Sequence, residues 1–326
     1  MLSIKENYMR ALSGEIPEYV PSYNSNFRIR PSILYGERKA EFGRAGRDIF
    51  GVEWTNEGSA FEEALPKSGD YILKDIRKWR DVIKFPDFSY VNWDDMSRAD
   101  FAKYNPELPI NGLGAAQGFF QSVVSFMGFM EGLIACHEEP EEVKELINYL
   151  CDGYLSIADD FLKYYKPDFI SFGDDIAHER NPFVSLEMFR DIFAPVWRRY
   201  IGFFKDRGYL ATHHNCGHFE EFLDDVVDMG FNCWDPAQPS NDLVAIKKKY
   251  GNKLMIAGGF DPRPFLPIYD ATEEQCRAAV KKLMDELAPG GGFAFSGGGL
   301  GQDPVSKQRS EWILDEYNEL KATYYQ

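Results

Sequence analysis

Residues 209–218 read YLATHHNCGH, a short apolar run that changes abruptly into polar residues. The run at 209–212 has the length and composition of a buried strand, and apolar residues recur at helical spacing from Phe219 to Val226. A strand that leads through a polar loop into a helix is one βα unit of a parallel sheet. The stretch therefore indicates an α/β fold.

Similar units occur throughout the C-terminal two thirds of the chain. The other segments that we expect to be strands are 168–172, 231–234, 253–257 and 292–295. Their repetition predicts a TIM (β/α)8 barrel, with residues 1–326 forming a single domain. In such a barrel the loops that follow the strands surround the active site, so polar residues in these loops are the candidate functional residues.

Helices are expected between these strands. Apolar residues recur at helical spacing over 140–161 and 185–204, and Thr272 with Gln275 forms a capping box before a third helix. Residues 1 to about 105 are less regular. There the sequence predicts a short helix over 3–12 and a Pro-flanked strand over 19–23.

The composition argues against several classes of partner. The chain has 52 acidic and 36 basic residues, and its formal net charge of −16 repels nucleic acid and anionic membrane surfaces. It contains neither a signal-type N-terminus nor an apolar run of the ~18 residues that span a bilayer. The five cysteines suggest no disulfide framework. We therefore expect a cytoplasmic protein without nucleic-acid or membrane partners, and a homodimer remains open.

The polar loop after 209–212 contains three of the five histidines of the chain. Imidazole and thiolate are preferred zinc ligands, and His214 and Cys216 are close enough in sequence to face one point. Cys233, inside the next expected strand, is a candidate further sulfur ligand, although a Cys in a short strand is more often packed than coordinating. The alternative is a polar turn with a buried free thiol, so the pair alone does not complete a metal site.

A second polar loop, 173–179, follows the preceding strand and reads GDDIAHE. In a barrel it faces the same cavity as His214. Asp174 and Asp175 are candidates for a metal ligand, for a general acid or base, or for a group that orients a histidine ligand. A solvated acidic loop is the alternative, since Asp is common at helix N-termini.

The sequence resembles the uroporphyrinogen decarboxylase superfamily and, within it, the zinc-dependent, corrinoid-linked methyltransferases. The resemblance implies a TIM barrel with its active site at the carboxyl ends of the strands. The stretches that carry it are NYMRALSGE at 7–15, VP at 20–21, FGDD at 172–175, HNCG at 214–217, KKYG at 248–251, GGFD at 258–261 and the Gly-rich strand at 290–295.

Two departures from the family pattern matter for function. The decarboxylases carry an Arg-Gln-Ala-Gly-Arg-Tyr signature that binds substrate propionates, whereas residues 26–31 here read NFRIRP. Arg28 and Arg30 remain candidates for holding a carboxylate. The methyltransferases hold zinc with a His-x-Cys pair and a late Cys, but residues 295–300 here read FSGGGL.

The missing late Cys leaves the third zinc ligand to another residue. His214 and Cys216 match the pair, and we predict Glu179 as the third ligand. Asp175, His178 and Cys233 are the alternatives, and loss of zinc altogether also remains open.

The resemblance implies a methyltransferase that moves a methyl group from a small methylated compound, such as an aryl methyl ether, to the cobalt of a separate corrinoid protein. An ether oxygen is a poor leaving group, so Zn²⁺ or a carboxylic acid must stabilise the departing phenolate. Asp174 and Asp175 are the predicted catalytic residues. The residues predicted to contact substrate are Phe119, Phe120, His178, His213, His218, Trp234 and Asp235.

Three other functions compete with this one. A decarboxylase of a porphyrinogen-like carboxylated substrate would need no metal. A methyl-corrinoid:thiol methyltransferase would use the same metal but favours a sulfur-rich site. A corrinoid- or tetrapyrrole-binding protein without catalytic activity is the third, although the polar residues at convergent loops argue against it.

Overall fold

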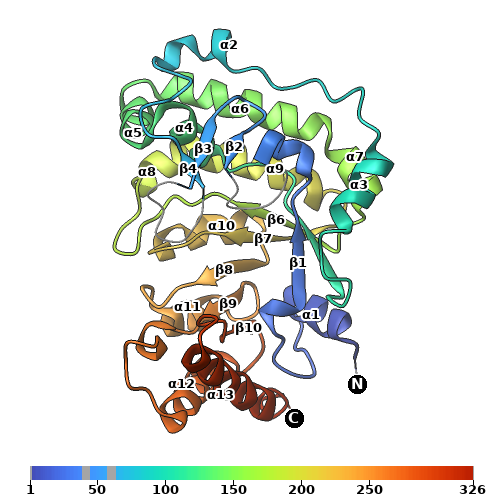
Figure 1. Ribbon diagram of the computed structural model, residues 1–326, viewed down its shortest axis with the longest axis vertical. Coiled ribbons are helices and arrows are strands. Elements are labelled where there is room, and N and C mark those ends of the chain that lie inside the picture. Colours follow the sequence, from blue (N-terminus) through green and yellow to red (C-terminus); the bar gives the residue numbers. More distant parts are fainter. Residues whose placement is uncertain (1, 39–44, 57–63, 326) are drawn as a thin grey trace.

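A curved parallel sheet lies at the centre of the protein, with helices on its outer side (Figure 1). The computed structural model describes residues 2–38, 45–56 and 64–325. Neighbouring strands of the sheet all run parallel, so their carboxyl ends meet at one edge. In sheet order the strands are β1 (Asn26–Ile29), β5 (Ile110–Leu113), β6 (Phe169–Gly173), β7 (Leu210–His214), β8 (Cys233–Ala237), β9 (Met255–Gly259) and β10 (Phe293–Ser296).

The two edges of this sheet are joined beside β10. Ser22 forms a parallel bridge with Phe295, whose N–H donates to the carbonyl oxygen of Pro21 at 2.9 Å. The sheet thus closes into a barrel of the TIM type, which confirms the predicted fold class. Within the described residues the ring consists of seven strands and this bridge, where the prediction has eight strands.

The strand predicted over 19–23 is wrong, because only the bridge at Ser22 forms there. Pro21 has no N–H to donate to a strand ladder. The N–H of Val20 donates instead to the carbonyl of Lys321, at the end of the last helix. The strand of this region is β1, whose residues the sequence did not mark as a strand.

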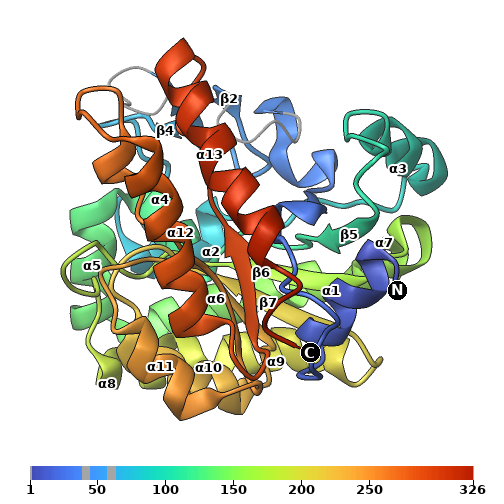
Figure 2. The same ribbon diagram turned by 90° about the horizontal axis from the view of Figure 1, so that it is seen from below.

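The helices pack around the barrel, and Figure 2 shows the last two, α12 and α13, side by side. The predicted helices are confirmed, including the capping box at Thr272, but the helix expected over 140–161 is divided at Ile157. Ser3 forms a second capping box, which was not predicted, with Glu6 of α1. The helices are α1 (Ile4–Leu12), α2 (Trp79–Val82), α3 (Trp93–Phe101), α4 (Phe119–Met127), α5 (Phe129–Glu138), α6 (Pro140–Ser156), α7 (Ala158–Tyr165), α8 (Leu186–Met188), α9 (Ala194–Lys205), α10 (Leu223–Met229), α11 (Leu243–Tyr250), α12 (Glu273–Leu287) and α13 (Pro304–Leu320).

The five strands predicted in the C-terminal two thirds are all present, each displaced by one to three residues toward the C-terminus. The largest difference is at β8, where the prediction ends at Trp234 and the strand continues through Pro236 to Ala237. Pairing with β9 shifts register between Trp234 and Ala237, and this irregularity accommodates the proline. Asp235 therefore lies within a strand.

The N-terminal part adds a small antiparallel sheet outside the barrel. Its strands are β2 (Gly46–Arg47), β3 (Glu53–Thr55) and β4 (Leu65–Pro66). Over the described ranges, no single helix is long and apolar enough to cross a membrane. The consecutive helices α4 and α5 have the length and apolar composition of a membrane span only when they are taken together, and the angle between them is 113°.

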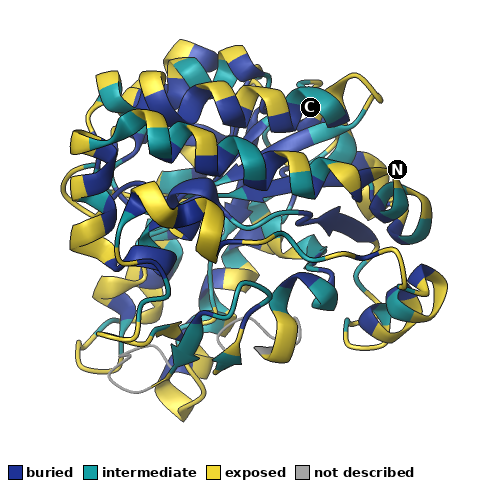
Figure 3. Cartoon of the chain, turned by 90° about the horizontal axis from the view of Figure 1, so that it is seen from above, coloured by how far each residue is buried: buried dark blue, intermediate teal, exposed yellow. Residues whose placement is uncertain are grey.

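Apolar side chains fill the barrel interior and the layer between strands and helices. Figure 3 shows buried strands inside and helices whose outer faces are exposed. One buried cluster, inside the barrel, includes Tyr8 of α1, Phe169 of β6, Cys233 of β8 and Met255 of β9. Because this cluster occupies the interior, polar groups of the strands are left to gather toward the carboxyl edge.

Candidate metal centre

Three side chains with metal-binding atoms lie at the carboxyl edge of β6 and β7. His214 is the last residue of β7, and Cys216 follows two residues later. Asp175 lies two residues beyond the end of β6, where Gly173 pairs with His214. The parallel register thus brings together two loops that are about 40 residues apart in sequence.

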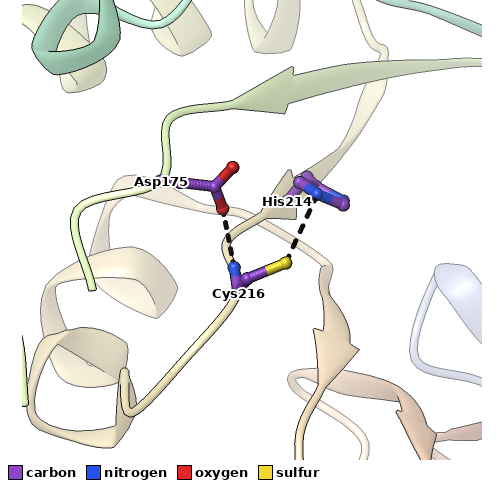
Figure 4. A group of neighbouring side chains, drawn as sticks. All are labelled: Asp175, His214 and Cys216. Atoms are coloured by element: carbon purple, nitrogen blue, oxygen red, sulfur yellow. Dashed lines mark hydrogen bonds between the residues drawn. The ribbon is translucent and has the colours of Figure 1, made fainter. Parts of the chain in front are cut away.

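Asp175, His214 and Cys216 form a compact group, the triad (Figure 4). One ligand atom from each lies within 4.8 Å of the others, and each residue is partly buried. The Cys216 Sγ is 3.9 Å from the His214 Nε2, and the Cys216 N–H donates to the Asp175 Oδ1 at 2.7 Å. The backbone bond fixes the two loops relative to each other.

The triad suits a zinc ion in both donor type and spacing. Imidazole nitrogen, thiolate sulfur and carboxylate oxygen are the three kinds of zinc ligand found in proteins. Bonds of about 2.0–2.3 Å in a tetrahedral arrangement place ligand atoms about 3.3–3.8 Å apart. The distance of 3.9 Å between Sγ and Nε2 is close to this value. The residues present therefore fit the metal that the sequence predicts.

Asp175, and not the predicted third ligand Glu179, is the carboxylate that lies beside His214 and Cys216. Glu179 is exposed, and its carboxylate pairs with the Arg263 guanidinium at 2.8 Å. Glu179 lies four positions after Asp175 in the sequence and is not part of the triad. Cys233 is also outside the triad, because its side chain is buried in the apolar cluster inside the barrel.

Hydrogen bonds to residues of β8 hold the loop that carries Cys216. The indole Nε1 of Trp234 donates to the Asn215 carbonyl at 3.0 Å, and the Asn215 N–H donates to the Asp235 carbonyl at 2.9 Å. Gly217 has φ +87°, and a Cβ there would lie 2.6 Å from the His178 carbonyl oxygen. Only glycine fits this close approach without strain.

Asp235 lies beside the triad and contacts His214 directly. Its Oδ1 is 2.9 Å from the His214 Nδ1 and accepts a hydrogen bond from the Tyr23 hydroxyl at 2.7 Å. The Arg28 guanidinium binds it through two hydrogen bonds of 2.7 Å, one to each carboxylate oxygen. Asp235, predicted to contact substrate, is instead fully buried as the partner of a candidate metal ligand.

The charged groups around Asp235 and His214 shift the pKa values of both side chains. Burial favours neutral Asp235, but the Arg28 guanidinium and the His214 ring outweigh it and hold the pKa of this carboxyl well below its usual range. Burial also disfavours charge on His214, yet the hydrogen bonds to Asp235 and Cys216, together with the charges of the Asp235 and Asp175 carboxylates, raise the pKa of the ring to about 10. The carboxylates around His214 therefore favour a positive charge at the position of its ring.

Asp174 has a different environment from Asp175. Its carboxylate is fully buried and accepts the N–H groups of Phe119, Phe120 and Gln121, the first turn of α4, at 2.9–3.0 Å. It also accepts the Trp197 indole N–H at 3.0 Å. A carboxylate that satisfies the unpaired donors of a helix N-terminus is a structural group. This placement argues against the predicted catalytic role of Asp174.

The aromatic residues predicted to contact substrate are in the core. Phe119 and Phe120 are buried among other aromatic rings of the helix layer, and Trp234 is buried beneath the Cys216 loop. None of the three side chains is more than 1% exposed. These positions argue against ring stacking on a substrate and assign the side chains to packing.

The three remaining histidines of the prediction also lie outside the triad. His213 is fully buried on the other face of β7, between Trp197 and Phe219, and burial lowers its pKa to about 3. The His218 Nδ1 lies 2.8 Å from the Ser240 carbonyl oxygen. His178 is exposed. The structure therefore brings His214 alone, among the predicted histidines, to the triad.

Two groups at the site were not predicted in their observed roles. Arg28 was considered for a substrate carboxylate but binds Asp235, and Tyr23 was not considered. Arg28 stands between the apolar residues Phe27 and Ile29, and a charged residue that is buried beside such neighbours needs a partner. The sequence does not identify that partner, which lies 207 residues away.

Comparison with known proteins supports the architecture. A family model described as "Uroporphyrinogen decarboxylase (URO-D)" matches residues 98–301. No curated protein sequence matches the chain. A solved structure described as a methyltransferase from Methanosarcina mazei is similar over 98% of this chain and 99% of that one, with a TM-score of 0.67 and 15% sequence identity. At that identity the similarity supports the fold. Because the family model spans more than half of the 326 residues, the chain belongs to the uroporphyrinogen decarboxylase (URO-D) family.

Proposed function

We propose that this protein is a zinc-dependent methyltransferase that transfers a methyl group from a small aryl methyl ether to a separate corrinoid protein. The observation that carries the proposal is the triad of Asp175, His214 and Cys216 at the carboxyl edge of a URO-D-family barrel. The similarity of the fold to that of a methyltransferase is consistent with it.

In this proposal the triad supplies three protein ligands and leaves a fourth position for substrate or water, as catalytic zinc sites do. Zinc bound there would act as a Lewis acid on the ether oxygen and stabilise the departing phenolate. Asp175 would supply an oxygen donor, whereas the methyltransferases that the sequence resembles use a second sulfur. Oxygen donates less electron density than thiolate, which suits polarising an ether better than activating a thiol.

Residues around the triad hold these ligands in place. The Gln121 side chain donates to the Asp175 Oδ2 at 3.2 Å, while the Cys216 N–H occupies Oδ1. Asp235 fixes the His214 ring from its other nitrogen. A preorganised ligand set reduces the cost of ordering side chains when the metal binds.

The competing functions have less support. Arg28 is bound to Asp235 through both terminal nitrogens, so it is not available for a porphyrinogen carboxylate. Cys216 is the only sulfur of the triad, whereas thiol activation favours a sulfur-rich site. The predominance of oxygen and nitrogen donors therefore favours ether demethylation.

Elemental analysis and a methyl-transfer assay test this proposal together. We expect stoichiometric zinc in the purified protein, and methylation of added cob(I)alamin by methoxylated aromatic compounds, followed by the absorbance of methylcobalamin. The protein without a cobalt acceptor should not turn over. Demethylation without cobalt, or activity that survives complete removal of metal, would show that the proposal is wrong.

A further inference from the structure

Arg28 and Asp235 form an ion pair across the barrel, directly behind the triad. Arg28 belongs to β1 and Asp235 to β8, two strands that are not neighbours in the sheet. The pair is 2.7 Å long, and the side chains are 14% and 0% exposed. It therefore connects distant parts of the barrel wall next to His214.

We infer that Arg28, acting through Asp235, is a positioning residue that sets the orientation and tautomer of His214 for metal binding. This inference rests on the proposed function, because it assigns a role toward the metal that the triad would hold. It concerns the charged layer behind the ligands, and it makes an N-terminal strand part of the metal centre.

The hydrogen bonds determine which His214 nitrogen faces the metal. An ionised carboxylate only accepts hydrogen bonds, so the Nδ1 that lies 2.9 Å from Asp235 must carry the proton. In the neutral ring that metal binding requires, the lone pair is then on Nε2, the nitrogen that lies 3.9 Å from the Cys216 sulfur. Asp235 thus directs the free nitrogen toward the other ligands.

Arg28 in turn determines how Asp235 is held. Its two terminal nitrogens bind the two carboxylate oxygens in a parallel fork, which fixes the plane of the carboxylate as well as its charge. The Tyr23 hydroxyl adds one bond to the Oδ1 that also faces His214. A lysine at position 28 would keep the charge but could not make the fork.

Zinc affinity of the apo protein tests the inference without relying on catalysis. Metal is removed with a chelator, and zinc binding is measured by competition with a chromophoric chelator. The variants are Arg28→Lys, Arg28→Met, Asp235→Asn and Tyr23→Phe. We expect a 10–100-fold loss of affinity for the Arg28 and Asp235 variants, the range typical of partners of metal ligands, and a smaller loss for Tyr23→Phe.

Arg309→Lys is the matched control. Arg309 is another buried arginine, but its guanidinium donates to the carbonyls of Phe265, Leu266 and Tyr269. It should lose stability in denaturant unfolding of the apo protein and keep its zinc affinity. Cobalt substitution adds a spectroscopic readout, since a displaced His214 changes the ligand-field bands while the thiolate-to-cobalt band of Cys216 persists.

The outcomes separate the two proposals. If the wild type binds no zinc, the proposed function fails and the inference fails with it. If the wild type binds zinc and the folded Arg28→Lys and Tyr23→Phe variants bind it within twofold of the wild type, the inference alone is overturned. Those two variants keep the charge or the ring, so they decide the question even if Arg28→Met does not fold.

Discussion

Two pairs of neighbouring residues at the ends of β6 and β7 have the same chemistry but opposite environments. The site-facing pair, Asp175 and His214, belongs to the triad. The helix-facing pair, Asp174 and His213, is fully buried, and both of its members contact Trp197 of α9. A shift of one residue along the chain thus separates a candidate ligand from a packing residue. For His213 and His214 the reason is that successive side chains of a strand point to opposite faces, and the two aspartates that follow the end of β6 diverge in the same way.

The largest effect is expected from the removal of a ligand of the triad. Cys216→Ala should abolish zinc content and methyl transfer, because two protein ligands are too few for a catalytic zinc site. Cys233→Ala is the matched control, since Cys233 is buried outside the triad and should affect stability alone. Metal analysis and the cobalamin assay measure both effects. Full activity of Cys216→Ala would contradict the assignment.

The two aspartates should respond in opposite ways. Asp174→Ala leaves three backbone donors of α4 and the Trp197 indole without their acceptor, and we expect it to lower the free energy of unfolding by roughly 3–5 kcal/mol. Asp175→Ala should change that free energy by about 1 kcal/mol or less and remove zinc. Denaturant unfolding in chelator and zinc analysis measure the two quantities. Similar stability losses for both variants would refute this division of roles.

The sequence predicts which loops meet at the site, because the strands that lead into them have a local signal. The strands over 168–172 and 209–212 are apolar runs that end in polar loops, a local pattern, and it was enough to place His214, Cys216 and Asp175 together. Whether a given side chain points to the site or to the helix layer depends on where each strand ends. The local pattern alone therefore does not distinguish His213 from His214, and it was the family resemblance that identified His214 as the ligand.

Contacts across the barrel could not be predicted from the sequence, for another reason. Arg28 and Asp235 are 207 residues apart, and a single chain carries no local signal for such a pair. The course of β8 through Pro236 was also missed, because proline usually ends a strand. As a result Asp235 was assigned to a loop that contacts substrate.

The pH dependence of stability should distinguish the buried His213 from the candidate ligand His214. Burial lowers the pKa of His213 to about 3, below the ordinary value of 6.5. Between these values the unfolded chain binds a proton that the folded chain does not, so stability falls as the pH falls, by up to about 1.4 kcal/mol per pH unit. His213→Phe removes this contribution and should keep zinc binding. Denaturant unfolding of the apo proteins from pH 7 to pH 5 measures the difference, and parallel pH profiles would contradict it.

The smallest expected effect concerns Gln121, which contacts both aspartates through different groups. Its backbone N–H donates to Asp174, while its side chain donates to the Asp175 Oδ2 at 3.2 Å. Gln121→Ala keeps the first contact and removes the second. Since alanine also favours the helix, the free energy of unfolding should change by less than about 0.5 kcal/mol. Zinc affinity should fall a few-fold, because Asp175 loses one of the two groups that orient it. Zinc competition and denaturant unfolding on the same samples measure both. A loss of stability without a loss of affinity would mean that the Gln121 side chain supports the helix-facing pair instead.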